Sequence, residues 1–167
     1  KEKFCFRLKS KPLFFRIDPD YECPCKVVVS DVPRPMLYEQ LKRDLDPIGR
    51  LEAASELTKN ASTEDVNILG ERLKKEKEWG VAIRIAKALG KICGEEARNF
   101  LIKGLKNSNP KIRKGIISAL GNFCHDKKSI LSIRQFAEKD PSYRVEAVAL
   151  QMLGKIKDKD SFAFLES

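Results

Sequence analysis

Cysteine and histidine are the residues of this chain whose side chains most readily do chemistry, and the chain has five cysteines and one histidine. One histidine excludes, within these 167 residues, the paired histidines of the metalloprotease zinc helix. Cys124 and His125 could form a nucleophile–base pair, but neighbouring side chains at a helix end point apart. We therefore expect Cys124 to fill a core position and His125 to lie near a helix C-terminus.

Three cysteines of the N-terminal segment form the best candidate for a metal site. Cys23 and Cys25 flank a proline, and Cys5 lies on a predicted neighbouring strand. A structural zinc ion takes four ligands and usually uses a Cys-x-x-Cys pair, whereas this set lacks a fourth ligand and has the spacing Cys-x-Cys. We therefore interpret these three cysteines as small apolar residues of a hairpin. We expect no metal site and no cofactor in this chain.

A row of lysines is the second candidate site. Lys59, Lys91 and Lys155 occupy equivalent positions in the C-terminal turns of three predicted helices, where they could form a basic strip that binds phosphates. The alternative is that each cation complements its helix dipole, which is worth about 0.3–1 kcal/mol. We favour the dipole because the fourth equivalent position is Asn122. Trp79 is expected to pack at a helix start rather than to stack on bases.

Composition and missing motifs exclude several functional classes. The chain contains no Gly-x-Gly-x-x-Gly, no P-loop and no Gly-x-Ser-x-Gly, so we expect no catalytic residue and no enzymatic activity. The net charge of +9 comes from cations interspersed with 24 acidic residues, which indicates a solvated surface, and we do not expect nucleic acid as a partner. No apolar run reaches the roughly 20 residues that span a bilayer. An odd cysteine count without disulfide spacing favours the cytoplasm.

The elements that must position these residues are helical repeats. Pro141 begins a helix in which Val145, Ala149, Met152 and Ile156 follow at steps of four, three and four. The leucine near the end of this helix recurs at intervals of 31 to 33 residues, as Leu57, Leu89, Leu120 and Leu153. A second register repeats every 32 residues, as Leu37, Leu69, Leu101, Ile133 and Leu165. Two interleaved helical registers with one period are typical of an α-solenoid.

The sequence therefore predicts a mainly α protein, an α–α superhelix over residues 35–167. The first helices of the pairs are expected at 36–43, after Ser62, at 95–106 and at 128–139. The second helices are expected at 47–60, 79–93, 110–124 and 141–157. An unfinished helix from Ser161 to Leu165 would follow, from which we expect that the repeat array is truncated here.

Residues 1–34 are predicted to form a small antiparallel β ribbon, the tail of a β-sandwich. Residues 3–9 alternate between apolar and polar side chains, residues 13–17 end at the turn signal Asp18-Pro19, and residues 26–30 are β-branched and apolar. A link over residues 31–35, with two prolines, separates this ribbon from the helices. Such a ribbon needs more sheet or a helix to pack against.

Two family resemblances rest on these segments. The pairs Asp46-Pro47, Asn109-Pro110 and Asp140-Pro141, each before an arginine- and alanine-rich helix, resemble HEAT-like repeats over residues 36–167. The segments 14–19, 26–29, 37–41 and 46–54 together are similar to the aminopeptidase N type of zinc metallopeptidases. This second resemblance implies that the chain joins the β-sandwich to the C-terminal helical domain of such an enzyme.

The aminopeptidase resemblance carries no site residue to this chain. The family's His-Glu-x-x-His and Gly-x-Met-Glu-Asn motifs do not occur here, so zinc is implied only for a catalytic domain outside this sequence. Our leading hypothesis is a noncatalytic HEAT-like region that walls the active-site chamber and controls access to it. Its partners would be the upstream catalytic domain, or a protein or peptide. We do not expect a membrane as a partner. The alternatives are a free-standing protein-interaction scaffold and a HEAT-like DNA-binding protein.

Overall fold

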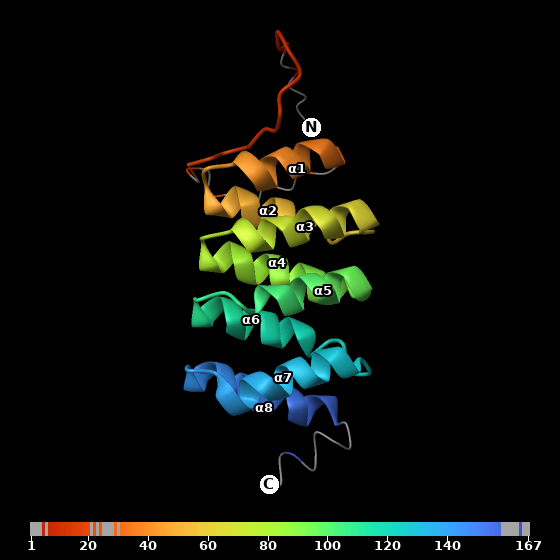
Figure 1. Ribbon diagram of the computed structural model, residues 1–167. Helices are drawn as coiled ribbons and strands as arrows, with labels where there is room; N and C mark the ends of the chain where they lie inside the picture. The colour runs from red at the N-terminus through yellow and green to blue at the C-terminus, as the bar shows by residue number, and fades with distance from the viewer. Residues whose placement is uncertain are drawn as a thin grey trace.

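Stacked antiparallel helix pairs form the body of the molecule in a computed structural model (Figure 1). The structure describes Cys5, residues 7–20, Glu22, Pro24, Val29, residues 31–157 and Phe164. These residues contain eight helices and no strand. The first helices of the pairs are α1 (Arg34–Arg43), α3 (Thr63–Lys75), α5 (Glu95–Gly104) and α7 (Lys127–Lys139). The second helices are α2 (Pro47–Glu56), α4 (Trp79–Ile92), α6 (Pro110–Leu120) and α8 (Tyr143–Ile156).

The helix starts follow from local hydrogen bonds that satisfy the unpaired N–H groups of a first turn. The Asp46 carboxylate accepts from the N–H of Ile48 at 2.8 Å, and Pro47 then starts α2. The Asn109 side chain caps α6 in the same way, 2.9 Å from the N–H of Lys111. Ser62 and Asp65 form a reciprocal capping box at the start of α3. The capping side chains thus set where three of the helices begin.

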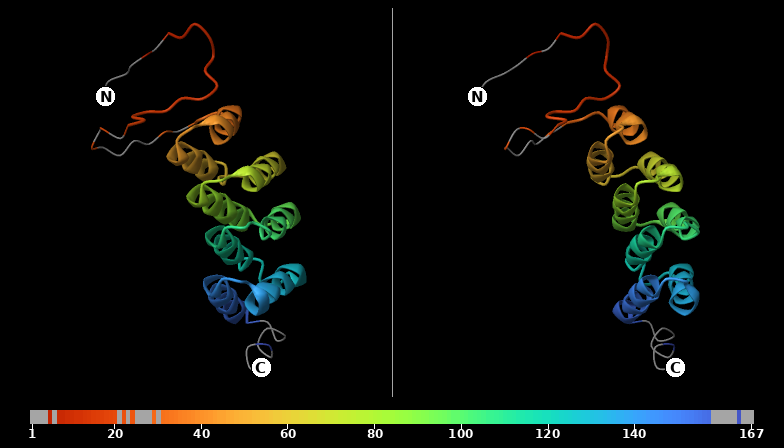
Figure 2. Two further views of the ribbon diagram at one scale, coloured as in Figure 1. Left: turned by 60° about the vertical axis from the view of Figure 1, so that its left-hand side comes forward. Right: turned by 90° about the vertical axis from the view of Figure 1, so that its left-hand side faces the viewer.

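The helices are arranged in two columns (Figure 2). We call α2, α4, α6 and α8 the B helices; they pack against one another in sequence, and α1, α3, α5 and α7, the A helices, cover one side of them. Two glycines allow close approach of α4 and α6. A Cβ on Gly90 would lie 2.9 Å from the carbonyl oxygen of Ala119, and one on Gly115 would lie 2.7 Å from the side chain of Ile83. The B helices therefore form a continuous column.

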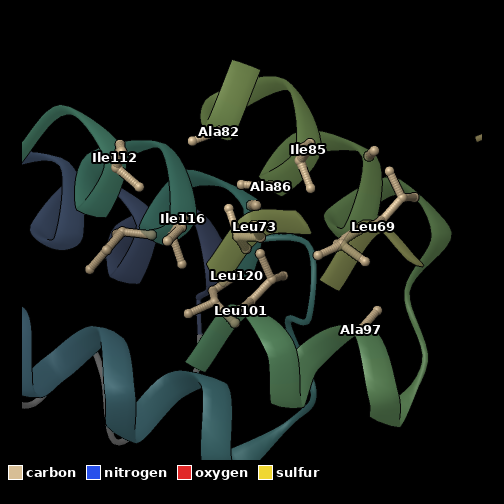
Figure 3. Packing of buried hydrophobic residues seen from close by; sticks show 14 of the residues in the cluster. Leu69, Leu73, Ala82, Ile85, Ala86, Ala97, Leu101, Ile112, Ile116 and Leu120 are labelled. Atoms are coloured by element: carbon tan, nitrogen blue, oxygen red, sulfur yellow. The ribbon is translucent and has the colours of Figure 1, made fainter. Parts of the chain in front are cut away.

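The two leucine registers predicted from the sequence are confirmed as the core. Leu57, Leu89, Leu120 and Leu153 are fully buried. The second register is buried too, in the four members that the structure describes: Leu37, Leu69, Leu101 and Ile133. Side chains from both columns meet between the helices, as Figure 3 shows for the middle of the array. Each repeat thus completes the core of its neighbours.

The predicted β ribbon is not found. Residues 13–17 form no strand, nor do Cys5 and residues 7–9, whereas only Val29 of the third predicted strand is described. An apolar segment forms a strand only where a partner strand and a covering layer exist, and here Leu13 remains 57% exposed and Ile17 54% exposed. The segment instead contacts the helices through Arg16, whose Nη2 lies 2.7 Å from Oδ2 of Asp46.

Three helix ends were predicted too far along the chain. α2 ends at Glu56, α5 at Gly104 and α6 at Leu120, because residues 57–60, 105–106 and 121–122 form turns instead of helix. The helix predicted to begin at Pro141 begins at Tyr143 instead. Asn60 has a left-handed φ of 49°, a conformation that asparagine tolerates better than most residues. The predicted helix from Ser161 to Leu165 lies outside the described residues except for Phe164.

Candidate interaction surface on the B helices

The charged residues of the chain are distributed unequally between the two helix columns. α4 and α6 contain no aspartate or glutamate, although each carries several lysines and arginines. The A helices α3, α5 and α7 mix both signs, as in Thr63–Lys75, which has two acids in its first turn and three cations in its last. The positive charge of α4 and of α6 is therefore not offset by any acidic residue of the same helix.

Helical periodicity places these cations on one side of the B column. One side of α4 is formed by positions 80, 84, 87 and 91, which follow at steps of four, three and four. The equivalent positions in the α6 segment are 111, 115, 118 and 122. Those in α8 are 144, 148, 151 and 155. The exposed cations at or beside these positions form what we call the basic B face: Arg84, Lys87, Lys91, Lys111, Lys114, Arg144 and Lys155.

These cations have no carboxylate partner within the described part of the chain. None of the seven forms an ion pair there, whereas Arg50, Arg98 and Arg113 all do. Glu146 of α8 does not neutralise the surface, because it occupies the position equivalent to Arg50 and Arg113, which point toward the turn within a repeat. The basic B face thus presents uncompensated positive charge to solvent.

Two exposed aromatic side chains stand at the edge of this face. Trp79 begins α4 and is 45% exposed, with the Lys111 ammonium 4.5 Å from its ring centroid. Tyr143 begins α8 and is 71% exposed, beside Arg144. A cation over an aromatic ring is attracted by its π electrons, so Lys111 is held beside Trp79 while remaining exposed. Trp79 lies at a helix start, as predicted, and contributes a partly exposed apolar surface.

The predicted lysine strip is only one row of this surface. Lys91 and Lys155 are exposed members of it, in the last turns of α4 and α8. Lys59 differs, because it lies beyond the end of α2 and pairs with Glu56 at 2.8 Å. Asn122 interrupts the row for a structural reason: its Nδ2 donates to the carbonyl oxygen of Gly90 at 3.1 Å, which ties two repeats together.

The other rows of the face were not predicted from the sequence, because their cations do not recur at one position in every repeat. These cations are Arg84, Lys87, Lys111, Lys114 and Arg144. The absence of acids from α4 and α6 was the signal that could have found them.

The charge of the surface reverses on α2. Glu52 and Ser55 occupy the positions equivalent to Arg84 and Lys87 of α4. Glu52 is exposed and forms no ion pair among the described residues, whereas Glu56 is held by Lys59. The B column thus runs from an acidic end at α2 to a basic stretch over α4, α6 and α8.

Two buried arginines, Arg50 and Arg113, each connect one repeat to the next. Arg113 donates from Nε and Nη2 to the Asp140 carboxylate at 2.7 and 2.8 Å, and from Nη1 to the carbonyl oxygens of Asn107 and Ser108. Arg50 binds Glu76 at 3.1 and 3.2 Å and the carbonyl oxygen of Asp44 at 2.8 Å.

These buried pairs belong to the fold and are not a reactive site. Each guanidinium joins the turn of its own repeat to the turn of the next. Arg50, Arg113 and Asp140 are all less than 10% exposed, and every one of them is paired. No charged group is therefore left free here for acid–base chemistry.

The family comparison agrees with this architecture. A model of HEAT repeats matches residues 34–108 and 98–167, which together cover every helix of the structure. The chain belongs to the HEAT-repeat family. No curated protein sequence matches it. In the part of the HEAT array that the structure describes, no helix has the length and apolar character needed to cross a bilayer.

The cysteine and histidine candidates do not converge in the described part of this HEAT-repeat chain. Cys124 and His125 are both exposed in the link between α6 and α7, so the predicted core position of Cys124 is wrong. The reason is that α6 ends at Leu120, four residues earlier. Cys5 is exposed as well, and Cys23 and Cys25 lie outside the described residues. The residues that are described contain no cluster of three or more metal-ligating side chains.

Acidification should weaken this HEAT array. Burial alone raises the pKa of Asp140 and of Glu76, but hydrogen bonds from backbone N–H groups and from Arg113 or Arg50 outweigh it and lower both pKa values. A lowered folded-state pKa contributes stability above the unfolded pKa, and that stability is lost as the pH falls through the folded value. Urea midpoints should therefore be constant above about pH 5 and fall below about pH 4.

The same titration of Asp140→Asn is the control for this prediction. This variant has lost one of the titrating carboxylates, so its urea midpoint should fall less between pH 7 and pH 3 than that of the unmodified chain. An equal fall in the two proteins would show that Asp140 does not contribute to the acid sensitivity.

Proposed function

We propose that this chain is a noncatalytic HEAT-repeat scaffold that holds a polypeptide on its basic B face. The observation that supports the proposal most is the set of seven exposed cations without carboxylate partners on three successive B helices. Charged side chains that are not needed for folding are available for recognition, and complementary charge speeds encounter with a partner and orients it.

The extent of the surface fits an extended segment better than a small molecule. Packed helices lie about 8–10 Å apart, so three B helices span roughly 20 Å between the outer axes. An extended polypeptide covers that distance with about six residues, at roughly 3.3 Å per residue. The partly exposed rings of Trp79 and Tyr143 at the edge of the face would add apolar contacts to the ionic ones.

We further propose that the scaffold is the C-terminal helical region of an aminopeptidase N-type protein, where it would wall the active-site chamber and control the entry of peptides. This finer role rests on the sequence resemblance of residues 14–54. One contact supports treating that segment as a unit: Arg16, from the motif over 14–19, pairs with Asp46, from the motif over 46–54. A His-Glu-x-x-His motif encoded upstream of Lys1 would support this role, and its absence from the whole gene product would refute it.

A charge-reversal experiment tests the binding proposal. A fluorescein-labelled hexaglutamate peptide should bind the chain in fluorescence anisotropy, and the double variant Lys87→Glu/Lys114→Glu should bind it about tenfold more weakly, a loss of about 1.4 kcal/mol. The matched control is Lys103→Glu/Lys128→Glu, which changes the net charge equally but alters exposed positions on the A helices α5 and α7.

The comparison of the two variants decides the outcome. If both weaken binding equally, net charge alone causes the attraction and the basic B face is not the site. Circular dichroism of each variant verifies that its helices are intact.

A further inference from the structure

The reversal of charge along the B column carries an inference that rests on the proposed function and extends it. We propose that the bound segment is a polypeptide with charges of both signs, oriented with acidic residues over α4, α6 and α8 and a basic residue over Glu52 of α2. The face therefore selects the direction of its ligand as well as its charge.

Equivalent positions on neighbouring B helices carry opposite charges. Glu52 of α2 and Arg84 of α4 occupy the same place in their repeats, both are exposed, and neither forms an ion pair among the described residues. The helices that carry them are in contact. Opposite charges therefore project from adjacent helices of one surface.

The remaining charges of the column strengthen this polarity. Lys59, which follows the end of α2 at the position equivalent to Lys91, is paired with Glu56, so the α2 end of the face has a net negative charge. Beyond it, α4 and α6 carry five exposed cations of the face and no acid. A ligand that lies along the column therefore meets a negative potential at one end and a positive potential over the rest.

This pattern favours a polypeptide over a nucleic acid. Nucleic acid carries one negative charge at every nucleotide, so a strand long enough to cover the basic helices would bring phosphates toward Glu52 if it continued along the column. A polypeptide can place lysine or arginine at that point and glutamate elsewhere. Opposite-sign pairs at both ends also fix the direction of the chain, because the reversed ligand would put like charges together.

Paramagnetic relaxation in the full chain tests the orientation. The probe is the peptide Lys-Lys-Gly-Ser followed by six glutamates, with a nitroxide at its lysine end in one sample and at its glutamate end in the other. The label at the lysine end should cause loss of the amide signals of α2, and the label at the glutamate end should cause loss of those of α8. The variant Glu52→Lys should still bind the peptide but lose this difference between the two labels.

Each outcome bears on a separate claim. Binding with the reversed pattern, or with equal loss at α2 and α8 for both labels, would overturn the proposed direction while leaving the binding function intact. If the peptide does not bind at all, both the function and the direction fail. A ten-residue oligothymidylate that binds more tightly than the peptide at physiological salt would overturn the assignment to a polypeptide.

Discussion

Replacing Arg113 by alanine should lower the free energy of unfolding by about 3–5 kcal/mol, the cost typical of breaking a buried ion pair by removing one partner. Arg113 is 8% exposed and Asp140 is 6% exposed. Without the guanidinium, Asp140 loses two hydrogen bonds of 2.7 and 2.8 Å, and the carbonyl oxygens of Asn107 and Ser108 lose their donor. An unpaired buried carboxylate is costly because the repeat interface cannot hydrate it as water does.

Urea denaturation followed by circular dichroism measures this effect. The control is Arg144→Ala, which removes an exposed arginine without an ion pair among the described residues and should change stability by less than about 0.5 kcal/mol. Arg50→Ala should destabilise less than Arg113→Ala, because Arg72 also binds Glu76, at 2.7 Å, and would still partner that carboxylate. Equal stability of Arg113→Ala and Arg144→Ala would show that the buried pair does not couple the repeats.

Replacing Leu101 by alanine should cost about 2–5 kcal/mol, because it leaves a cavity that the surrounding helices fill only in part. Leu101 is fully buried in α5 and lies in the middle of the array, among side chains of both columns (Figure 3). Each repeat is stabilised by its neighbours, so the loss should spread beyond α5. Hydrogen exchange should show reduced protection of α3 and α6, which both contact α5.

Leu131→Ala is the matched control for the core substitution. Leu131 lies on α7 and is 61% exposed, so removing its side chain leaves no cavity and should change stability by less than about 0.5 kcal/mol. If Leu101→Ala changed exchange only within α5, the repeats would be energetically independent, contrary to the continuous core that the structure shows.

The sequence by itself determined the repeat architecture. Leucines at intervals of about 32 residues identify the buried positions, because a helix period and a repeat period together leave only one arrangement that buries them all. Local chemistry also determined where helices begin, since Asp46 and Asn109 cap their own chain and need no distant partner. These features depend on residues close in sequence, or on a pattern repeated often enough to be unmistakable.

Features that depend on a distant partner could not be read from the sequence. The mostly apolar residues 13–17 are compatible with a strand, but a strand needs another strand to bind, and the structure gives this segment a contact through Arg16 instead. Cys124 continued the helical register, yet α6 ends at Leu120 and leaves it exposed. In both cases the local pattern was present, and the tertiary contacts that would realise it were not.

The candidate site was decided almost wholly by the tertiary structure. Along the chain, Arg84, Lys114 and Arg144 are separated by segments that contain acidic residues, so the sequence reads as mixed in charge; these acids include Glu95, Glu96, Asp126 and Glu138. Stacking places every second helix in the same column, which removes those acids from the surface and collects the cations on it. The net charge of the whole chain cannot reveal such a surface, because the charge of the surface depends on which helices become neighbours in space.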